Sequence, residues 1–117
     1  MMPPQPGEIY WAYLDERERR PVIVVSREEL NRGHYVTVVP LTSAKLEARR
    51  DLPNCVPLRA GRNGLDKDCV AQAELMASLH QSYLDLRTGM IDTLDGESMR
   101  NVIRAMGYVI SADCEPV

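Results

Sequence analysis

The sequence predicts a mainly β domain: a small barrel of five or six short strands with one amphipathic helix near the C-terminus. Three observations support this fold class. Short runs rich in β-branched and aromatic residues recur between turn signals. No helical pattern separates these runs, which disfavours a doubly wound α/β fold. The one clear helical period comes last, at residues 95–110.

The length of 117 residues suits one domain, and neither repeats nor low-complexity tracts interrupt it. We therefore expect a single domain over residues 1–117. Residues 1–6 are rich in proline, and we expect this segment to be loose or extended and flexible.

The first three predicted strands come early in the chain. Residues 8–14 (EIYWAYL) mix aromatic and apolar side chains, and the charged DERERR that follows is predicted as a loop. Residues 21–26 (PVIVVS) and 35–41 (YVTVVPL) are almost wholly apolar, as expected for buried strands. Between them, residues 27–31 suit one helical turn ahead of an Asn-Arg-Gly turn.

The second half of the chain predicts shorter elements. A polar, mobile loop is expected at 45–53, and a turn at 61–64. Further strands are expected at 55–58 and 68–75, and a short helix or turn at 81–87. The apolar residues of the final helix fall on one face that we expect to pack against the core: Met99, Val102, Ile103, Met106 and Ile110. Asp95 is predicted as its N-cap.

The net charge of −3 argues against a strongly basic nucleic-acid binder. The charge is nevertheless uneven along the chain. Residues 17–62 hold ten Arg or Lys against five Asp or Glu, whereas residues 63–117 hold four against nine. A basic surface in the first half is therefore expected within an acidic whole.

The three cysteines form neither a CxxC motif nor a Cys/His cluster, which argues against a disulfide framework and against a zinc site. A reducing, cytoplasmic compartment is expected. No apolar run approaches the ~20 residues that cross a bilayer, and the start has no secretory pattern.

Polar side chains flank two of the predicted buried strands. Arg20 comes directly before Pro21, and Thr42 and Ser43 directly follow Leu41. Neighbouring antiparallel strands place the start of one beside the end of the other, so we expect these three side chains at one rim of the barrel. A guanidinium and two hydroxyls suit a phosphate group, although polar residues at strand ends are also ordinary.

Several segments, taken as an ordered set, resemble the MazF/PemK family of bacterial toxins from about Pro6 to Ile110. They are PGEIYWAYL, RRPVIVVS, Asn31, VVPLTS, GLDKDCV and IDTLDGESMRNVI. The resemblance implies an SH3-like (CcdB/PemK-type) barrel with a C-terminal helix, assembled as a homodimer. It also implies a ribosome-independent, sequence-specific endoribonuclease acting on single-stranded RNA without cofactor or metal, and a cognate antitoxin that blocks the site with a flexible acidic segment.

The resemblance also implies roles for individual residues. Arg20 matches the family's essential arginine and would stabilise the extra negative charge on the phosphoryl oxygens as the ribose 2′-OH attacks phosphorus. Thr42 matches the essential threonine and would donate a hydrogen bond to a phosphoryl oxygen or to the 2′-OH. Ser43, Arg17 and Arg19 are the expected RNA contacts.

The general acid and base stay open between five candidates, of which Asp15 and Glu16 lie in the charged loop DERERR. Glu18 is two residues from Arg20, as a base or as its salt-bridge partner. His34 carries an imidazole that suits proton transfer, but it lies in the Asn-Arg-Gly-His turn. Glu74 suits either a base edge of the RNA or the dimer interface.

The chain departs from the family pattern around residues 72–76, at the end of the strand predicted at 68–75. There Ala73 and Met76 replace a commonly acidic residue and a commonly basic one. This departure motivates one alternative to the nuclease, an inactive, RNA-binding or purely regulatory descendant. A second alternative keeps the same barrel but binds a protein target without catalysis, as the CcdB-type gyrase poison does. Trp11 and Tyr13 share one face of the first strand, where core or dimer packing and base stacking are both open.

Overall fold

Three neighbouring strands from the first half of the chain form the centre of the fold in a computed structural model that describes residues 2–16 and 18–112. β1 (Glu8–Tyr13), β2 (Arg19–Val24) and β3 (Tyr35–Thr42) pair antiparallel in that order. Their sequences are apolar because both faces of this sheet are buried. One face carries Ile9, Ile23, Val39 and Leu41, and the other carries Tyr10, Ala12, Val22, Val24, Val36 and Val38.

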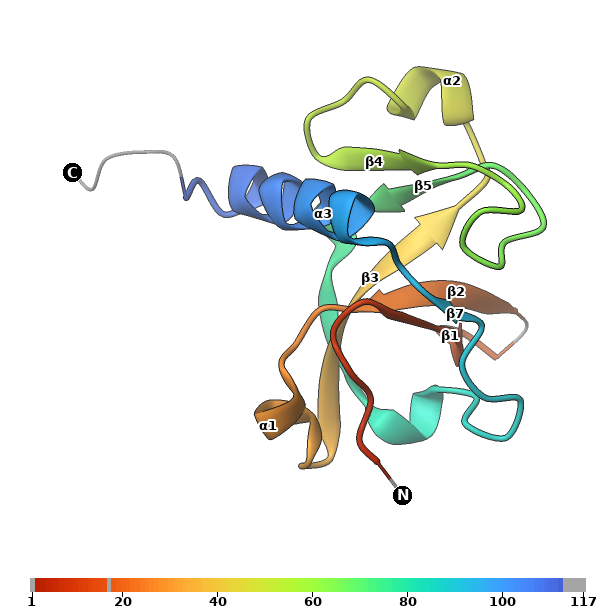
Figure 1. The fold of residues 1–117 in the computed structure, drawn as a ribbon, viewed down its shortest axis with the longest axis vertical. Coiled ribbons are helices and arrows are strands. Elements are labelled where there is room, and N and C mark those ends of the chain that lie inside the picture. The colour runs from red at the N-terminus through yellow and green to blue at the C-terminus, as the bar shows by residue number, and fades with distance from the viewer. Residues whose placement is uncertain (1, 17, 113–117) are drawn as a thin grey trace.

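The remaining strands curl this sheet into a half-barrel. β4 (Cys55–Leu58) and β5 (Cys69–Gln72) lie beyond β3, and β7 (Asp92–Thr93) borders β1, which gives the order β4-β5-β3-β2-β1-β7. β6 (Ala77–His80) pairs with the first half of β3, whereas β5 pairs with its end. In Figure 1, β3 extends from the level of α1 (Glu28–Asn31) toward β4 and β5. The predicted mainly β class is confirmed.

The helices are short except the last. They are α1 (Glu28–Asn31), α2 (Leu46–Arg49), the 3₁₀ turns η1 (Ala73–Leu75) and η2 (Gln81–Tyr83), and α3 (Gly96–Val109). α3 packs against β4 and η1, and it lies alongside β4 and β5 in Figure 1. Among the described residues, no helix combines the length and the apolar character needed to span a membrane.

The face of α3 that packs inward differs from the predicted one. Val102 and Ala105 are buried, but Ile103 is 56% exposed and Ile110 is 66% exposed. The prediction for these two isoleucines was wrong because the apolar stripe is wider than the surface that β4 and η1 offer. Only the middle of the stripe is covered, and residues 103 and 110, seven apart, lie on its flank.

Three predicted boundaries also need correction. The strand expected at 68–75 ends at Gln72, because the Ala73 carbonyl accepts the Met76 N–H at 3.1 Å and the chain turns into η1. The polar loop expected at 45–53 contains α2. β6 and β7 were not predicted: β6 is largely exposed and lacks the alternation of a half-buried strand, and β7 has two residues.

The segment before β1 was expected to be loose or extended. In its described part, Pro4 is buried and its carbonyl accepts a hydrogen bond of 2.9 Å from the Asn31 amide. Asn31 itself is 1% exposed, and its amide also donates to the Ser26 carbonyl. A buried polar side chain needs such partners, and here they tie the N-terminal segment to α1.

Candidate active site

The start of β2 and the end of β3 meet at one hollow. Val22 faces Pro40 in the antiparallel pair, and continuing that register places Arg20 opposite Thr42. Both residues and Ser43 line a pocket of about 320 Å³. Arg20 and Ser43 are exposed, so this pocket is open to solvent. We call it the rim pocket, and its other walls come from Trp11, Arg19 and the loop at 64–69.

Thr42 is held in one orientation at the end of β3. Its side chain is 9% exposed, and Oγ1 accepts the Ala44 N–H at 3.1 Å. A threonine at a strand end makes this local turn readily, since its hydroxyl reaches the backbone two residues on. The hydroxyl proton is left over from this bond and can be donated to a ligand in the rim pocket.

Arg20 has only a loose partner. Its Nη2 lies 3.8 Å from Oε2 of Glu18, and the two side chains are 45% and 62% exposed. An exposed pair at this distance contributes little to stability. The charge of Arg20 is therefore available to an anion, and Glu18, which also lines the rim pocket, stands beside it.

The loop between β4 and β5 closes another side of the rim pocket, and Gly64 shapes it. Gly64 has a φ of +69°, and a Cβ there would lie 3.0 Å from Cγ2 of Ile91. Only glycine fits both demands. The loop also brings Lys67 to the pocket, a third cation after Arg19 and Arg20, which the sequence did not indicate by itself. The one available signal was its place in the GLDKDCV segment of the family pattern.

Cys69 lines the rim pocket but does not suit nucleophilic chemistry. The thiol is 7% exposed, and its burial raises its pKa from the ordinary value of 9.0, with a further rise from Asp68. The Sγ atom donates to the Lys67 carbonyl at 3.3 Å. A thiol of this kind stays protonated at neutral pH.

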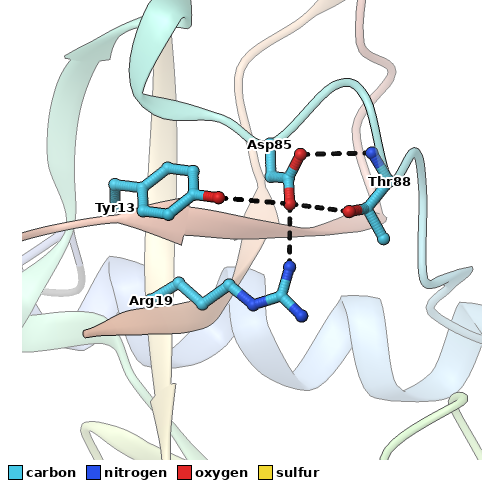
Figure 2. Close-up of polar contacts among 4 residues, drawn as sticks. All are labelled: Tyr13, Arg19, Asp85 and Thr88. Atoms are coloured by element: carbon cyan, nitrogen blue, oxygen red, sulfur yellow. Dashed lines mark hydrogen bonds and ion pairs between the residues drawn. The ribbon is translucent and has the colours of Figure 1, made fainter. Parts of the chain in front are cut away.

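Arg19 is bound much more tightly than Arg20. Its Nη1 lies 2.8 Å from Oδ2 of Asp85, and its guanidinium carbon lies 4.7 Å from the centroid of the Trp11 ring. Figure 2 shows Asp85 at the centre of four contacts, with Tyr13, Arg19 and two groups of Thr88. The Thr88 hydroxyl and then the Thr88 N–H lower the pKa of Asp85, and Arg19 lowers it further.

The family of the chain follows from its overall match. The model for PemK-like, MazF-like toxins of type II toxin–antitoxin systems matches residues 5–110. The chain belongs to this family. No curated protein sequence matches it.

Solved structures of MazF-type toxins share the fold. The Mycobacterium tuberculosis toxin MazF-mt6 is 26% identical, with 89% of this chain and 96% of that chain covered and a TM-score of 0.75. An endoribonuclease in complex with its cognate antitoxin, from a mycobacterial species, is 21% identical over 97% and 99% of the two chains, with a TM-score of 0.78. A MazE–MazF complex from Deinococcus radiodurans is 22% identical over 93% and 96%, with a TM-score of 0.72.

In this MazF-like chain, two predicted site residues lie away from the rim pocket. His34 stacks on His80, with ring centroids 6.0 Å apart. Glu74 is exposed on η1 and accepts hydrogen bonds from Asn54 and Gln72. Arg17 lies outside the described residues.

The structure therefore brings together Arg20, Thr42, Ser43, Arg19 and Glu18, and their roles stay predictions. Sequence reasoning missed Asp85, which it placed only within a short helix or turn at 81–87. In the described part of the chain, no three His, Cys, Asp or Glu side chains are grouped to hold a metal ion.

Proposed function

We propose that this toxin-family chain is a ribosome-independent endoribonuclease that cuts single-stranded RNA at specific sequences, with the scissile phosphate in the rim pocket. One observation carries the proposal: a guanidinium and two hydroxyls, from Arg20, Thr42 and Ser43, line one open pocket. Family membership supports it, as does the fold shared with a mycobacterial protein named an endoribonuclease.

The proposed reaction is an attack of the ribose 2′-OH on the adjacent phosphorus. The 2′-proton passes to a base, the bond from phosphorus to the 5′-oxygen breaks, and that oxygen takes up a proton. The products are a 2′,3′-cyclic phosphate and a 5′-hydroxyl end. Arg20 stabilises the added charge on the phosphoryl oxygens because a guanidinium stays charged at neutral pH. Thr42 donates its hydroxyl proton to one of these oxygens.

Glu18 is the proposed base. Of the five candidates from the sequence, it alone lines the rim pocket. Its carboxylate can accept the 2′-proton, and Arg20 beside it holds the phosphate within reach.

The test is cleavage of a long single-stranded RNA by the purified protein in EDTA, with the new ends mapped. We expect discrete cuts with cyclic phosphate ends. Arg20→Ala and Thr42→Ala should each lower the rate by about 10²-fold to 10³-fold, as removal of one oxyanion donor does elsewhere. Glu18→Gln should lower it by at least about 10²-fold, because a general base contributes that much.

Arg32→Ala is the matched control. Arg32 is also exposed and also pairs with a nearby glutamate, Glu28 at 3.3 Å, but it does not line the rim pocket. It should leave the rate within about threefold, as expected for a surface change. RNA binding without cuts would instead favour the regulator alternative, which rests on Ala73, 1% exposed, and Met76, packed against the core, where the family resemblance implies charged residues.

The proposal extends to assembly and partners. We propose a homodimer acting in the cytoplasm, and a cognate antitoxin whose acidic segment covers the cations of the rim pocket, Arg19, Arg20 and Lys67. Similar solved structures named as toxin–antitoxin complexes support this partner. A CcdB-like gyrase poison is disfavoured, since such a protein has no need of phosphate-binding groups.

A further inference from the structure

Two side chains, Arg19 lying over the Trp11 ring, form the wall of the rim pocket beside Arg20. Arg19 lies over Trp11 with its guanidinium carbon 4.7 Å from the ring centroid, and both residues line the pocket. The side chain of Arg19 is 41% exposed, so part of the guanidinium remains open to a ligand. A guanidinium over an indole ring is a stable arrangement.

Asp85 holds the side chain of Arg19 and the backbone of Trp11 in this stack. Its Oδ2 accepts from Arg19 at 2.8 Å, and its own N–H donates to the Trp11 carbonyl at 2.7 Å. Thr88 holds the carboxylate in turn, through its hydroxyl at 2.7 Å and its N–H at 3.1 Å. The side chain of Asp85 is 8% exposed, so these bonds are shielded from water more than those of a surface pair.

The two neighbouring arginines therefore differ in what they offer to RNA. Arg20 has an exposed partner at 3.8 Å and can meet a phosphate with its full charge. Arg19 is already paired with a buried carboxylate, which lowers its value as a phosphate contact. Its plane and its unused N–H donors are still available, and these suit a nucleobase.

We propose that Trp11 and Arg19 form the binding site for the nucleobase next to the scissile phosphate, with Asp85 as the positioning residue. This inference rests on the proposed function. The base stacks on the Trp11 ring edge to edge with the Arg19 guanidinium, and the free N–H groups of Arg19 donate to acceptors on the facing edge of the base. Guanine presents two adjacent acceptors, O6 and N7, whereas adenine replaces one of them with an amino donor. The site therefore favours guanine at this position.

The test compares the cleavage sites of wild type and Asp85→Asn on a pool of single-stranded RNA of random sequence in EDTA, with all new ends sequenced. The wild type should prefer guanine at one position flanking the cut. In Asp85→Asn this preference should fall by about 5-fold to 100-fold, the size of one good base contact. A role that was only structural would lower all cuts alike and leave the preference unchanged.

Asp95→Asn is the matched control. Asp95 makes the same local pair of bonds, to the N–H and hydroxyl of Ser98, but Arg62 acts on it through its charge alone, without a hydrogen bond or ion pair among the described residues. It should leave the base preference as in wild type.

Arg19→Lys decides the matter should Asp85→Asn fail to fold. Lysine keeps a positive charge beside Asp85 but loses the planar fork, so the guanine preference should again relax. Unchanged preference in the folded variants, with the wild type cutting RNA, would overturn the inference and leave the nuclease proposal standing. A wild type that cuts no RNA would overturn both.

Discussion

Asp85 and Asp95 begin the same local turn in two parts of the molecule. In each, Oδ1 accepts the N–H of the residue three positions on and Oδ2 accepts its hydroxyl, from Thr88 and Ser98 respectively. In each, these bonds are the main cause of a lowered pKa, led by the hydroxyl at Asp85 and by the N–H at Asp95. Their local chemistry is therefore almost identical.

Their surroundings differ. Asp95 starts α3, which is anchored by buried apolar side chains such as Val102 and Ala105. Asp85 starts no regular helix, and its second oxygen takes Arg19 and Tyr13 from across the sheet. At Asp95 this turn begins α3, which the core holds in place. At Asp85 the same turn positions Arg19 in the wall of the rim pocket. Apolar burial should dominate stability around Asp95, and polar contacts should dominate geometry around Asp85.

The largest effect on stability is expected from Val102→Ala. Val102 is fully buried, and truncating it removes two methyl groups from the core beneath α3. The free energy of unfolding should fall by about 2 kcal/mol. Ile103→Ala is the control on the same helix, because Ile103 is 56% exposed and alanine favours helix. Its effect should stay below about 0.5 kcal/mol.

Urea unfolding of the two variants measures both values. Equal losses would show that the flank of α3 is covered in solution. The buried face of α3 would then contribute no more to stability than its exposed flank, contrary to the structure.

Effects of equal or smaller size are expected from two glycines in and beside the segment that joins the aspartates. Gly89 closes the Asp85 turn by donating its N–H to the Asp85 carbonyl, with φ at +86° and open space around a Cβ. Gly89→Ala should cost about 1 kcal/mol, from the left-handed backbone alone. Gly64→Ala adds contact with Ile91 to the same backbone strain, so it should cost more, about 2 kcal/mol.

Thermal unfolding of the two glycine variants, analysed at a common temperature, separates strain from contact. The cleavage rate should fall more in Gly64→Ala, because its loop lines the rim pocket. A larger loss in Gly89→Ala would mean that the Asp85 turn carries more of the fold than its few buried side chains indicate.

Parts of this comparison could be predicted from the sequence. Asp95 was predicted as an N-cap because a capping residue and its partner are three positions apart, and the local pattern contains both. Arg20 and Thr42 could be placed together because consecutive antiparallel strands fix which ends meet. In both cases the deciding relation is local, or follows from one pairing of neighbouring strands.

The Arg19–Asp85 pair could not be predicted in this way. The two residues are 66 positions apart, and their meeting depends on how the segment after β6 returns to β1. The periodicity of the sequence does not indicate how this segment returns to β1. For the same reason the inward face of α3 was only partly predicted: the width of its apolar stripe is local information, but the width of the surface it meets is not.

The smallest effects are expected from the pH dependence of stability. For Asp85 and Asp95 the pKa in the folded protein lies below the ordinary value of 3.8, so the folded state holds its protons less tightly than the unfolded chain. Each carboxylate therefore stabilises the fold fully above that value. This stabilisation is lost as the pH falls below 3.8 through the folded pKa. Melting temperatures measured between about pH 5 and pH 2 should fall less steeply in Asp85→Asn and in Asp95→Asn than in wild type.

The two aspartates should separate when their partners are changed. Thr88→Val removes the leading cause of the lowered pKa of Asp85, and Arg19→Gln removes a lesser one. Carboxyl titration by NMR should therefore show a larger rise in the Asp85 pKa for Thr88→Val, with Asp95 unmoved in both variants. A larger rise for Arg19→Gln would mean that the long-range ion pair dominates the local turn. The two regions would then differ in their electrostatics as well as in what they hold in place.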